Sequence, residues 1–197
     1  DFTNVYRGIY IAGGLSSQVT RNNIQLYEPD YNSALQAYGI YLNQCKGYIV
    51  HENYIHGDIS NLVPKNTYGI IINASGKNDH EVYKNILMDL RVGLQSQGVN
   101  SFEFYLPNPL IQISSGLRWK CNRFRSIYEA DISYPSGSVA KDQGFCLANM
   151  NANSPAGNIF SRSTFNPYNE YWLNADVSAI YYRHHDPLAP SPVGVDP

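Results

Sequence analysis

The sequence has few charged residues and no long apolar segment. Charged side chains make up 15% of the 197 residues, well below the roughly 25% of an average globular domain. The longest apolar stretches, such as Ile70–Ile72, have the length of a strand, far short of the ~18 apolar residues of a membrane-spanning helix. The net charge of −2 gives no electrostatic reason to expect DNA or RNA. We therefore expect neither a nucleic-acid partner nor membrane insertion.

Cysteine is scarce as well, with only Cys45, Cys121 and Cys146. An odd number leaves at least one thiol unpaired, and the spacings fit no zinc motif. A disulfide between Cys121 and Cys146 and a set of buried free thiols remain open alternatives. The first residues have neither the basic start nor the apolar core of a signal peptide, so we expect a piece of a longer chain.

Tyrosine is abundant, with 17 copies, and a short motif of glycine followed by Ile or Leu opens an apolar strand five times. Tyrosine together with uncharged polar side chains favours β-structure with solvated faces. The successive glycines are separated by 31, 30, 24 and 23 residues. The two longer spacings contain polar insertions over 25–36 and 57–65, which a loop tolerates at little cost in stability. The five copies begin at Gly8, Gly39, Gly69, Gly93 and Gly116.

A second motif, Val-x-x-Asn-x-Ile/Leu, follows the first motif in the first three copies. Its asparagines are Asn22, Asn53 and Asn85. Two motifs that recur in the same order predict one structural unit per repeat. An inward asparagine that stacks on its equivalent in the next repeat would satisfy buried turn groups, each of which costs about 1–3 kcal/mol if left unpaired. We therefore expect these three residues to form a ladder that sets the register of the repeats.

The glycine motif also predicts which side chains face the interior. Because alternate residues of a strand point to opposite sides, Ile40 and Leu42 are expected inside and Tyr41 outside. Glycine at the strand entrance is expected to allow a tight turn with positive φ. The predicted fold is all-β, a right-handed parallel β-helix over 1–135, followed by an irregular capping extension with a proline-rich tail over 136–197. The alternative, a β-sandwich of hairpins, would be marked by Asn-Gly or Asp-Gly turns, which do not occur.

Several phrases resemble a known group of proteins. Gly-Ile-Tyr-Leu-Asn-Gln-Cys-Lys-Gly-Tyr from Gly39, Val-His-Glu-Asn from Val50 and Gly-Ile-Ile-Ile-Asn-Ala-Ser-Gly from Gly69 resemble the pectin-lyase-like, right-handed β-helix repeats of large secreted proteins of Bacteroidetes. The resemblance implies a secreted or cell-surface location and export by the type IX secretion system. It also implies that glycans or cell-surface proteins are the partners to consider.

No set of residues predicts catalysis, a metal or a cofactor. A glycoside hydrolase needs two facing carboxyl groups, and the acidic residues do not fall at matching positions of the repeats. His184 and His185 are adjacent on a predicted strand and point to opposite faces, so they do not form a metal site. The two functional hypotheses are a non-catalytic spacer or adhesin module, and a polysaccharide lyase or hydrolase with its active groups in the insertions.

The outward positions of the glycine motif give the candidate binding residues. Aromatic rings with polar neighbours can contact sugar rings or a protein surface, and an arginine adds a forked donor for a carboxylate. Simple packing between repeats is the alternative role for the same row. The predicted row consists of Tyr10, Tyr41, Ile71, Gln95 and Arg118, among which we expect Tyr10, Tyr41, Gln95 and Arg118 to contact a ligand.

Overall fold

The fold is built entirely of strands in the part of the chain that the computed structural model describes. Within that part there is no helix, and hence none that could cross a membrane. The described residues are 1–27, 35–58, 66–76, 78, 80–105, 112–140, 142–143, 156–161, 169–173 and 181–182.

Six parallel strands form the largest sheet, which we call sheet 1. Its cross-strand partners include Ile9 with Ile40, Ile40 with Ile70, and Ile70 with Leu94. The parallel stacking predicted for these four copies of the glycine motif is therefore confirmed. In order across the sheet, the strands are β2 (Arg7–Ala12), β5 (Ala37–Asn43), β8 (Thr67–Asn73), β11 (Val92–Gly98), β15 (Ala130–Gly137) and β17 (Asn169–Leu173).

Two further sheets contain the strands of the valine–asparagine motif. Sheet 2 consists of β3 (Gln18–Thr20), β6 (Ile49–His51), β9 (His80–Tyr83), β13 (Gln112–Lys120) and, at its edge, β12 (Ser101–Tyr105). Sheet 3 consists of β1 (Phe2–Val5), β4 (Asn23–Leu26), β7 (Tyr54–His56), β10 (Ile86–Met88) and β14 (Arg123–Arg125). All strand pairs in these two sheets are parallel except β12 with β13.

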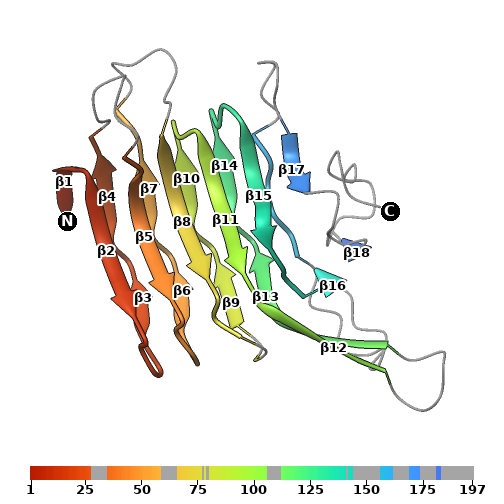
Figure 1. Cartoon of the computed structure of the whole chain (residues 1–197). Coiled ribbons are helices and arrows are strands. Elements are labelled where there is room, and N and C mark those ends of the chain that lie inside the picture. Colours follow the sequence, from red (N-terminus) through yellow and green to blue (C-terminus); the bar gives the residue numbers. More distant parts are fainter. Residues whose placement is uncertain are drawn as a thin grey trace.

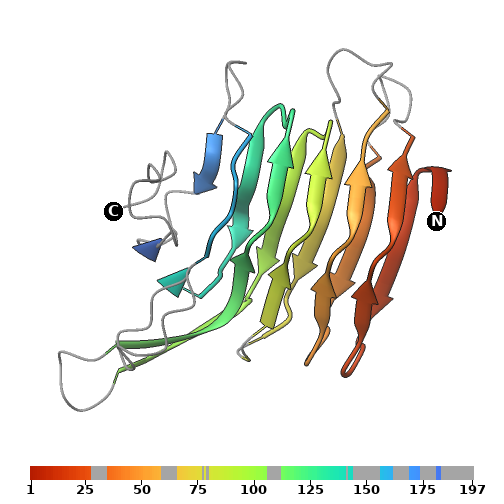
Figure 2. The same cartoon turned by 180° about the vertical axis from the view of Figure 1, so that it is seen from behind.

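The chain visits sheets 1, 2 and 3 in the same order four times, and we call each such visit a repeat. The first repeat contains β2, β3 and β4, the second β5, β6 and β7, the third β8, β9 and β10, and the fourth β11, β13 and β14. Figures 1 and 2 show the repeats stacked side by side from the N-terminal end, with the β12–β13 hairpin extending away from the stack.

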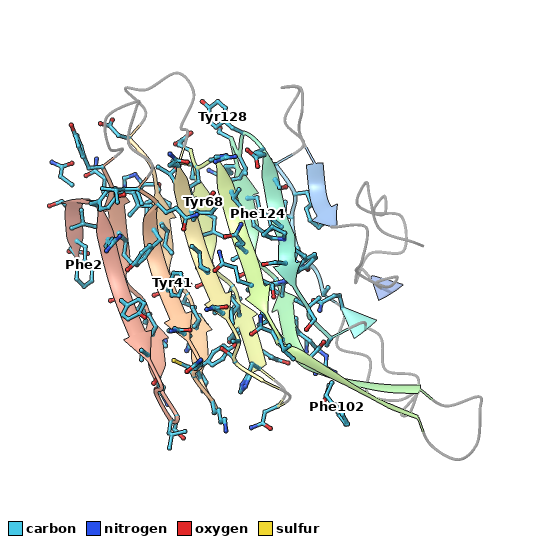
Figure 3. All side chains as sticks on the ribbon, viewed as in Figure 1. Phe2, Tyr41, Tyr68, Phe102, Phe124 and Tyr128 are labelled. Carbon is cyan, nitrogen blue, oxygen red and sulfur yellow. The ribbon has the colours of Figure 1, made fainter. Side chains whose placement is uncertain are left out.

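The core lies between the sheets and consists of the alternate residues that the sequence predicts. Sheet 1 contributes Ile40, Leu42, Ile70 and Ile72, all fully buried. Sheet 2 contributes Val50, Val82 and Trp119, and sheet 3 contributes Ile55, Leu87 and Phe124. Figure 3 shows Phe124 among the side chains of the stack. Apolar burial at one level after another stabilises the stack, at about 25 cal/mol per Å².

The glycines of the first motif have a different role from the predicted one. Gly39, Gly69 and Gly93 do not adopt positive φ. A Cβ on Gly39 would instead lie 2.6 Å from Cγ2 of Ile55, and one on Gly69 would lie 2.5 Å from the carbonyl oxygen of Gly93. The prediction of a tight turn is therefore wrong. Glycine is needed here because the backbone packs directly against the next repeat and the core.

The fifth copy of the glycine motif does not join sheet 1. Leu117 pairs with His80 in sheet 2, and the position next to Leu94 in sheet 1 is occupied by Ile132 of β15. The prediction for Leu117 is wrong because the fourth repeat contains the inserted antiparallel β12–β13 hairpin. This hairpin places a second Gly-Leu pair at a spacing that imitates one repeat, although Gly116 alone among the five glycines has positive φ, 134°.

The stack continues past residue 135. Strand β15 itself runs to Gly137, β17 pairs with it in parallel, and Asn158 contacts Asn122 of the fourth repeat. A small separate sheet pairs β16 (Asp142–Gln143) with β18 (Tyr181–Tyr182). The predicted proline-rich tail from Asp186, and with it His184 and His185, lies outside the described residues.

Two thiols are described. Cys45 is buried, and its Sγ lies 3.3 Å from the carbonyl oxygen of Ile11. Cys121 is exposed and free. Cys146, the partner considered for Cys121 in a disulfide, lies outside the described residues.

Candidate functional site

The residues predicted to face outward form one row across sheet 1, which we call the outer row. Cross-strand pairing places Tyr10, Tyr41, Ile71, Gln95 and Ser133 side by side in successive strands. Exposure falls steeply along the row, from 55% for Tyr10 to 0% for Ile71 and 5% for Gln95. Ile71 packs with Tyr38, Tyr41, Tyr68 and Val92 in a second apolar cluster on this face. The outer row is therefore accessible at Tyr10 and Tyr41, and the prediction of an exposed Gln95 is wrong.

Arg118 does not belong to the outer row. It lies in β13 and is paired in register with Glu81 of sheet 2. The fifth member of the row is Ser133 of β15. The prediction fails for the same reason as that for Leu117, because the inserted hairpin shifts Gly116 and the residues after it into another sheet.

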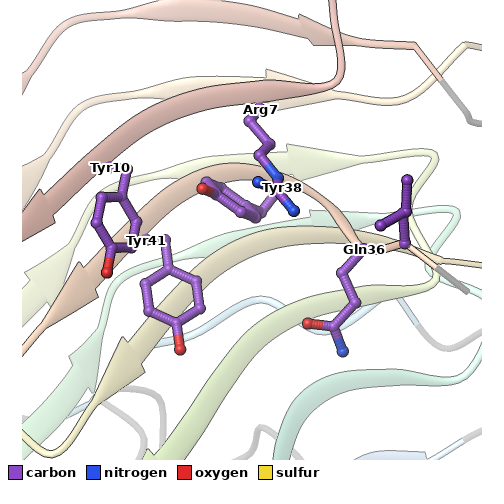
Figure 4. Close-up of a pocket in the computed structure, with 6 residues that line it drawn as sticks. Arg7, Tyr10, Gln36, Tyr38 and Tyr41 are labelled. Atoms are coloured by element: carbon purple, nitrogen blue, oxygen red, sulfur yellow. The ribbon is translucent and has the colours of Figure 1, made fainter.

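A shallow pocket of about 510 Å³ opens beside the accessible end of the outer row. Three tyrosine rings form one part of its wall (Figure 4). The ring centroids of Tyr10 and Tyr41 are 5.4 Å apart with planes tilted by 37°, and those of Tyr38 and Tyr41 are 5.3 Å apart with a tilt of 55°. We call this the tyrosine pocket; its described lining is Arg7, Tyr10, Leu35, Gln36, Tyr38 and Tyr41.

The phenol and amide groups around the pocket form hydrogen bonds to one another. The Tyr41 hydroxyl donates to Oε1 of Gln97 at 3.1 Å, and Nδ2 of Asn43 donates to the Tyr10 hydroxyl oxygen at 3.4 Å. Nδ2 of Asn73 in turn donates to Oδ1 of Asn43 at 3.0 Å. These contacts hold the two accessible rings, which lowers the conformational entropy that a ligand would otherwise have to remove.

Tyr38 and Tyr41 are neutral hydrogen-bonding groups. Burial raises the pKa of Tyr38 and of Tyr41 above the ordinary value for a phenol. For Tyr38, the nearby Arg7 opposes that shift without reversing it. At physiological pH both side chains therefore offer an aromatic face and an uncharged hydroxyl.

Four lining residues were not predicted from the sequence, and Arg7 is the charged one among them, beside Leu35, Gln36 and Tyr38. Its guanidinium carbon lies 5.5 Å from the ring centroid of Tyr6 and 5.7 Å from that of Tyr38, distances at which a cation is attracted to an aromatic face. The sequence contains a pattern that points to Arg7. The residue directly before the motif glycine is Arg7, Tyr38, Tyr68 and Val92 in the four repeats, and these residues form a second row next to the outer row.

The predicted asparagines meet on the opposite, inner side of the repeats. Both the backbone N–H and Nδ2 of Asn22 donate to Oδ1 of Asn53 at 3.0 Å. The corresponding groups of Asn53 donate to Oδ1 of Asn85, at 3.0 and 2.9 Å. Nδ2 of Asn53 also donates to the carbonyl oxygens of Val19 and His51. Each amide thus satisfies backbone groups of its own and of a neighbouring repeat.

The asparagine row is longer than predicted, and we call the whole of it the inner row. Asn85 donates to Asn122, and Asn122 donates to Asn158, by the same pair of contacts. The residue before each asparagine has φ between 52° and 60°, a conformation that turns the chain between sheets 2 and 3. Asn122 does not match the motif because Trp119 replaces its valine and Phe124 its Ile/Leu, and Asn158 does not match because Pro155 and Phe160 occupy the same positions. The inner row consists of Asn22, Asn53, Asn85, Asn122 and Asn158.

The described residues give no metal-binding cluster. No group of three or more His, Cys, Asp or Glu side chains within that part of the chain is placed to hold an ion. The described lining of the tyrosine pocket contains no acidic residue. Its chemistry is therefore that of recognition by aromatic faces, amides and one guanidinium.

Comparisons with known proteins add no relative. No protein-family model, no curated protein and no solved structure matches the chain. We therefore infer a function from the residues of the tyrosine pocket.

Proposed function

We propose that the stacked repeats form a right-handed parallel β-helix. Two observations support this: the chain visits the three sheets in the same order in each repeat, and equivalent strands of successive repeats pair in parallel. The inner row fits such a solenoid, because its amides connect one repeat to the next. A rigid stack of this kind suits a spacer that carries a binding face.

The function that the geometry supports best is that of a non-catalytic module that binds carbohydrate at the tyrosine pocket. The observation that carries the proposal is the cluster of three tyrosine rings with Gln36 and Arg7 around an accessible hollow. Sugar rings have apolar faces that pack on aromatic side chains and hydroxyls that bond to amides and guanidinium groups. The rings of Tyr10 and Tyr41 belong to neighbouring strands and together offer a surface of the size of a sugar residue.

The residue types of the outer row support a non-catalytic function. Its matching positions hold Tyr, Tyr, Ile, Gln and Ser, whereas a hydrolase needs two carboxyl groups on either side of the sugar bond. The proposed setting is the cell surface or the extracellular space, with a glycan or a glycosylated surface protein as partner. The resemblance of the repeats to those of secreted Bacteroidetes proteins supports that setting.

The test is a glycan array probed with the wild-type protein and with Tyr10→Ala. Tyr10 is 55% exposed, so its removal is expected to leave the stack intact. Loss of a stacking ring removes on the order of 1 kcal/mol of contact, which corresponds to a several-fold weaker affinity for the glycan that wild type binds. Tyr54→Ala, a half-buried tyrosine on the outer face of sheet 3, is the matched control and is expected to bind normally.

Three results would count against the proposal. Equal binding by wild type and Tyr10→Ala would remove the tyrosine pocket from consideration. Absence of binding to any glycan would contradict a carbohydrate module. Release of unsaturated or reducing sugars from a polysaccharide by the wild-type protein would establish the competing function, a lyase or a hydrolase.

A further inference from the structure

The tyrosine pocket contains an arginine whose charge has no counter-ion among the described residues. The ion pairs among the described residues include those of Arg21 and His51 with Glu52, of Arg91 with Glu129 and of Lys120 with Glu81. None of them includes Arg7, which lines the pocket and is exposed. We propose that Arg7 makes the pocket selective for a saccharide that carries an anionic group, a carboxylate or a sulfate. The inference rests on the proposed carbohydrate-binding function and adds the charge of the ligand to it.

The position of Arg7 supports a selective role. Its guanidinium lies against the rings of Tyr6 and Tyr38, and Figure 4 shows its side chain beside Tyr38 at the border of the pocket. These contacts restrict the side chain without using its five N–H donors, because an aromatic face attracts the cation through its electron density. The donors therefore remain for a group in the pocket, and their fork matches the geometry of a carboxylate or a sulfate.

The rest of the pocket decides which ligands are excluded. Three tyrosine rings without an arginine would also suit a cationic ligand, because aromatic faces attract cations. The fixed positive charge of Arg7 opposes such a ligand, and no acidic residue in the described lining compensates for it. A neutral saccharide can use the rings and Gln36 but gains nothing from the charge. The expected order of affinity is therefore anionic, then neutral, then cationic.

The experiment compares three oligosaccharides of equal length and linkage: one neutral, one carboxylated and one with a free amine on each residue. Titration calorimetry with the wild-type protein is expected to give the tightest binding for the carboxylated ligand, by about five- to tenfold over the neutral one. The factor is modest because a charge-assisted hydrogen bond contributes the least free energy when its site is partly solvated. A sulfated fourth ligand distinguishes the two kinds of anion. Raising the salt concentration is expected to weaken anionic binding and to leave neutral binding unchanged.

Two variants of Arg7 identify the residue responsible. Arg7→Gln is expected to reduce the affinity for the carboxylated ligand to that for the neutral one, and Arg7→Lys to retain part of the preference. Arg21→Gln is the control, because Arg21 is exposed, lies at the turn before Asn22 and is paired with Glu52. Equal binding of neutral and anionic ligands by wild type would overturn the selectivity but leave the proposed function in place. Failure of all ligands to bind would instead contradict the proposed function itself.

Discussion

Two rows of side chains cross the same repeats and differ in how much they vary. The inner row has asparagine in each of five successive positions, whereas the outer row has Tyr, Tyr, Ile, Gln and Ser. The inner amides bond to backbone groups that are shielded from water, so a change at one level leaves donors and acceptors unpaired. The outer side chains satisfy no such requirement. The inner row therefore holds the stack together, while the outer row offers side chains for binding where it is accessible, at Tyr10 and Tyr41.

The largest effect is expected from breaking the inner row at Asn53. The side chain of Asn53 accepts two hydrogen bonds from Asn22 and donates to Val19, His51 and Asn85. Asn53→Leu leaves several of these buried groups without partners, and we expect a loss of about 3 kcal/mol in the free energy of unfolding. Chemical denaturation measures it. Asn23→Ala, at an exposed position, is the control, and an unchanged midpoint for Asn53→Leu would refute the structural role of the row.

A somewhat smaller effect is expected at Gly69, where the backbone of sheet 1 packs closely against the next repeat and the core. A Cβ there would lie 2.5 Å from the carbonyl oxygen of Gly93 and 2.7 Å from Cδ2 of Leu87. Gly69→Ala is expected to cost about 2 kcal/mol, as for other overpacked sites. Gly13 provides the contrast, because its φ is 64° but no atom lies within 4 Å of an added Cβ. Gly13→Ala is expected to cost about 1 kcal/mol through backbone strain alone. A smaller loss of stability for Gly69→Ala than for Gly13→Ala would show that the close contacts at Gly69 do not determine the cost of an added Cβ.

The two rows also differ in how far the sequence predicts them. The stacking of sheet 1, to which the outer row belongs, followed from the matching residue types of the glycine motif, although its spacing varies between 24 and 31 residues in these copies. The inner row was predicted only as far as Asn85, because aromatic residues replace the aliphatic ones around Asn122. A motif that also allowed aromatic residues at these positions would have included Asn122.

The remaining errors have physical causes that a one-dimensional motif does not contain. Gly116 repeats the glycine motif at a plausible spacing, but the antiparallel hairpin before it diverts the chain to sheet 2. Alternation correctly places Tyr41 and Gln95 on one face, yet it does not give exposure, which depends on how Tyr38, Tyr68 and Val92 pack around Ile71. Arg7 and Tyr38 stand directly before the motif glycine, a position whose residue type varies between the repeats, so the motif does not include it.

The smallest effect concerns Asp89, at the turn that follows β10. Burial raises the pKa of its carboxyl group, and this effect exceeds the opposing ones of Ser126 and His56. Because the folded-state pKa lies above the unfolded value, the ionised carboxylate lowers stability at neutral pH, and this penalty disappears as the pH falls through the raised pKa. Asp89→Asn removes the charge and tolerates the φ of 54°.

We therefore expect Asp89→Asn to raise the thermal midpoint slightly at pH 7. The difference from wild type should vanish at about pH 3, below the ordinary carboxyl range. Thermal scans at several pH values measure it. A destabilised variant at pH 7 would mean that the carboxylate makes a favourable contact that outweighs its burial.

The most direct test of the division between the two rows is the saccharide affinity of Tyr10→Ala, measured together with its unfolding midpoint. We expect a several-fold weaker affinity and an unchanged midpoint, because Tyr10 contributes a ring to the tyrosine pocket and is 55% exposed. An unchanged affinity, or an affinity lost only together with the fold, would contradict a binding site built on the outer row.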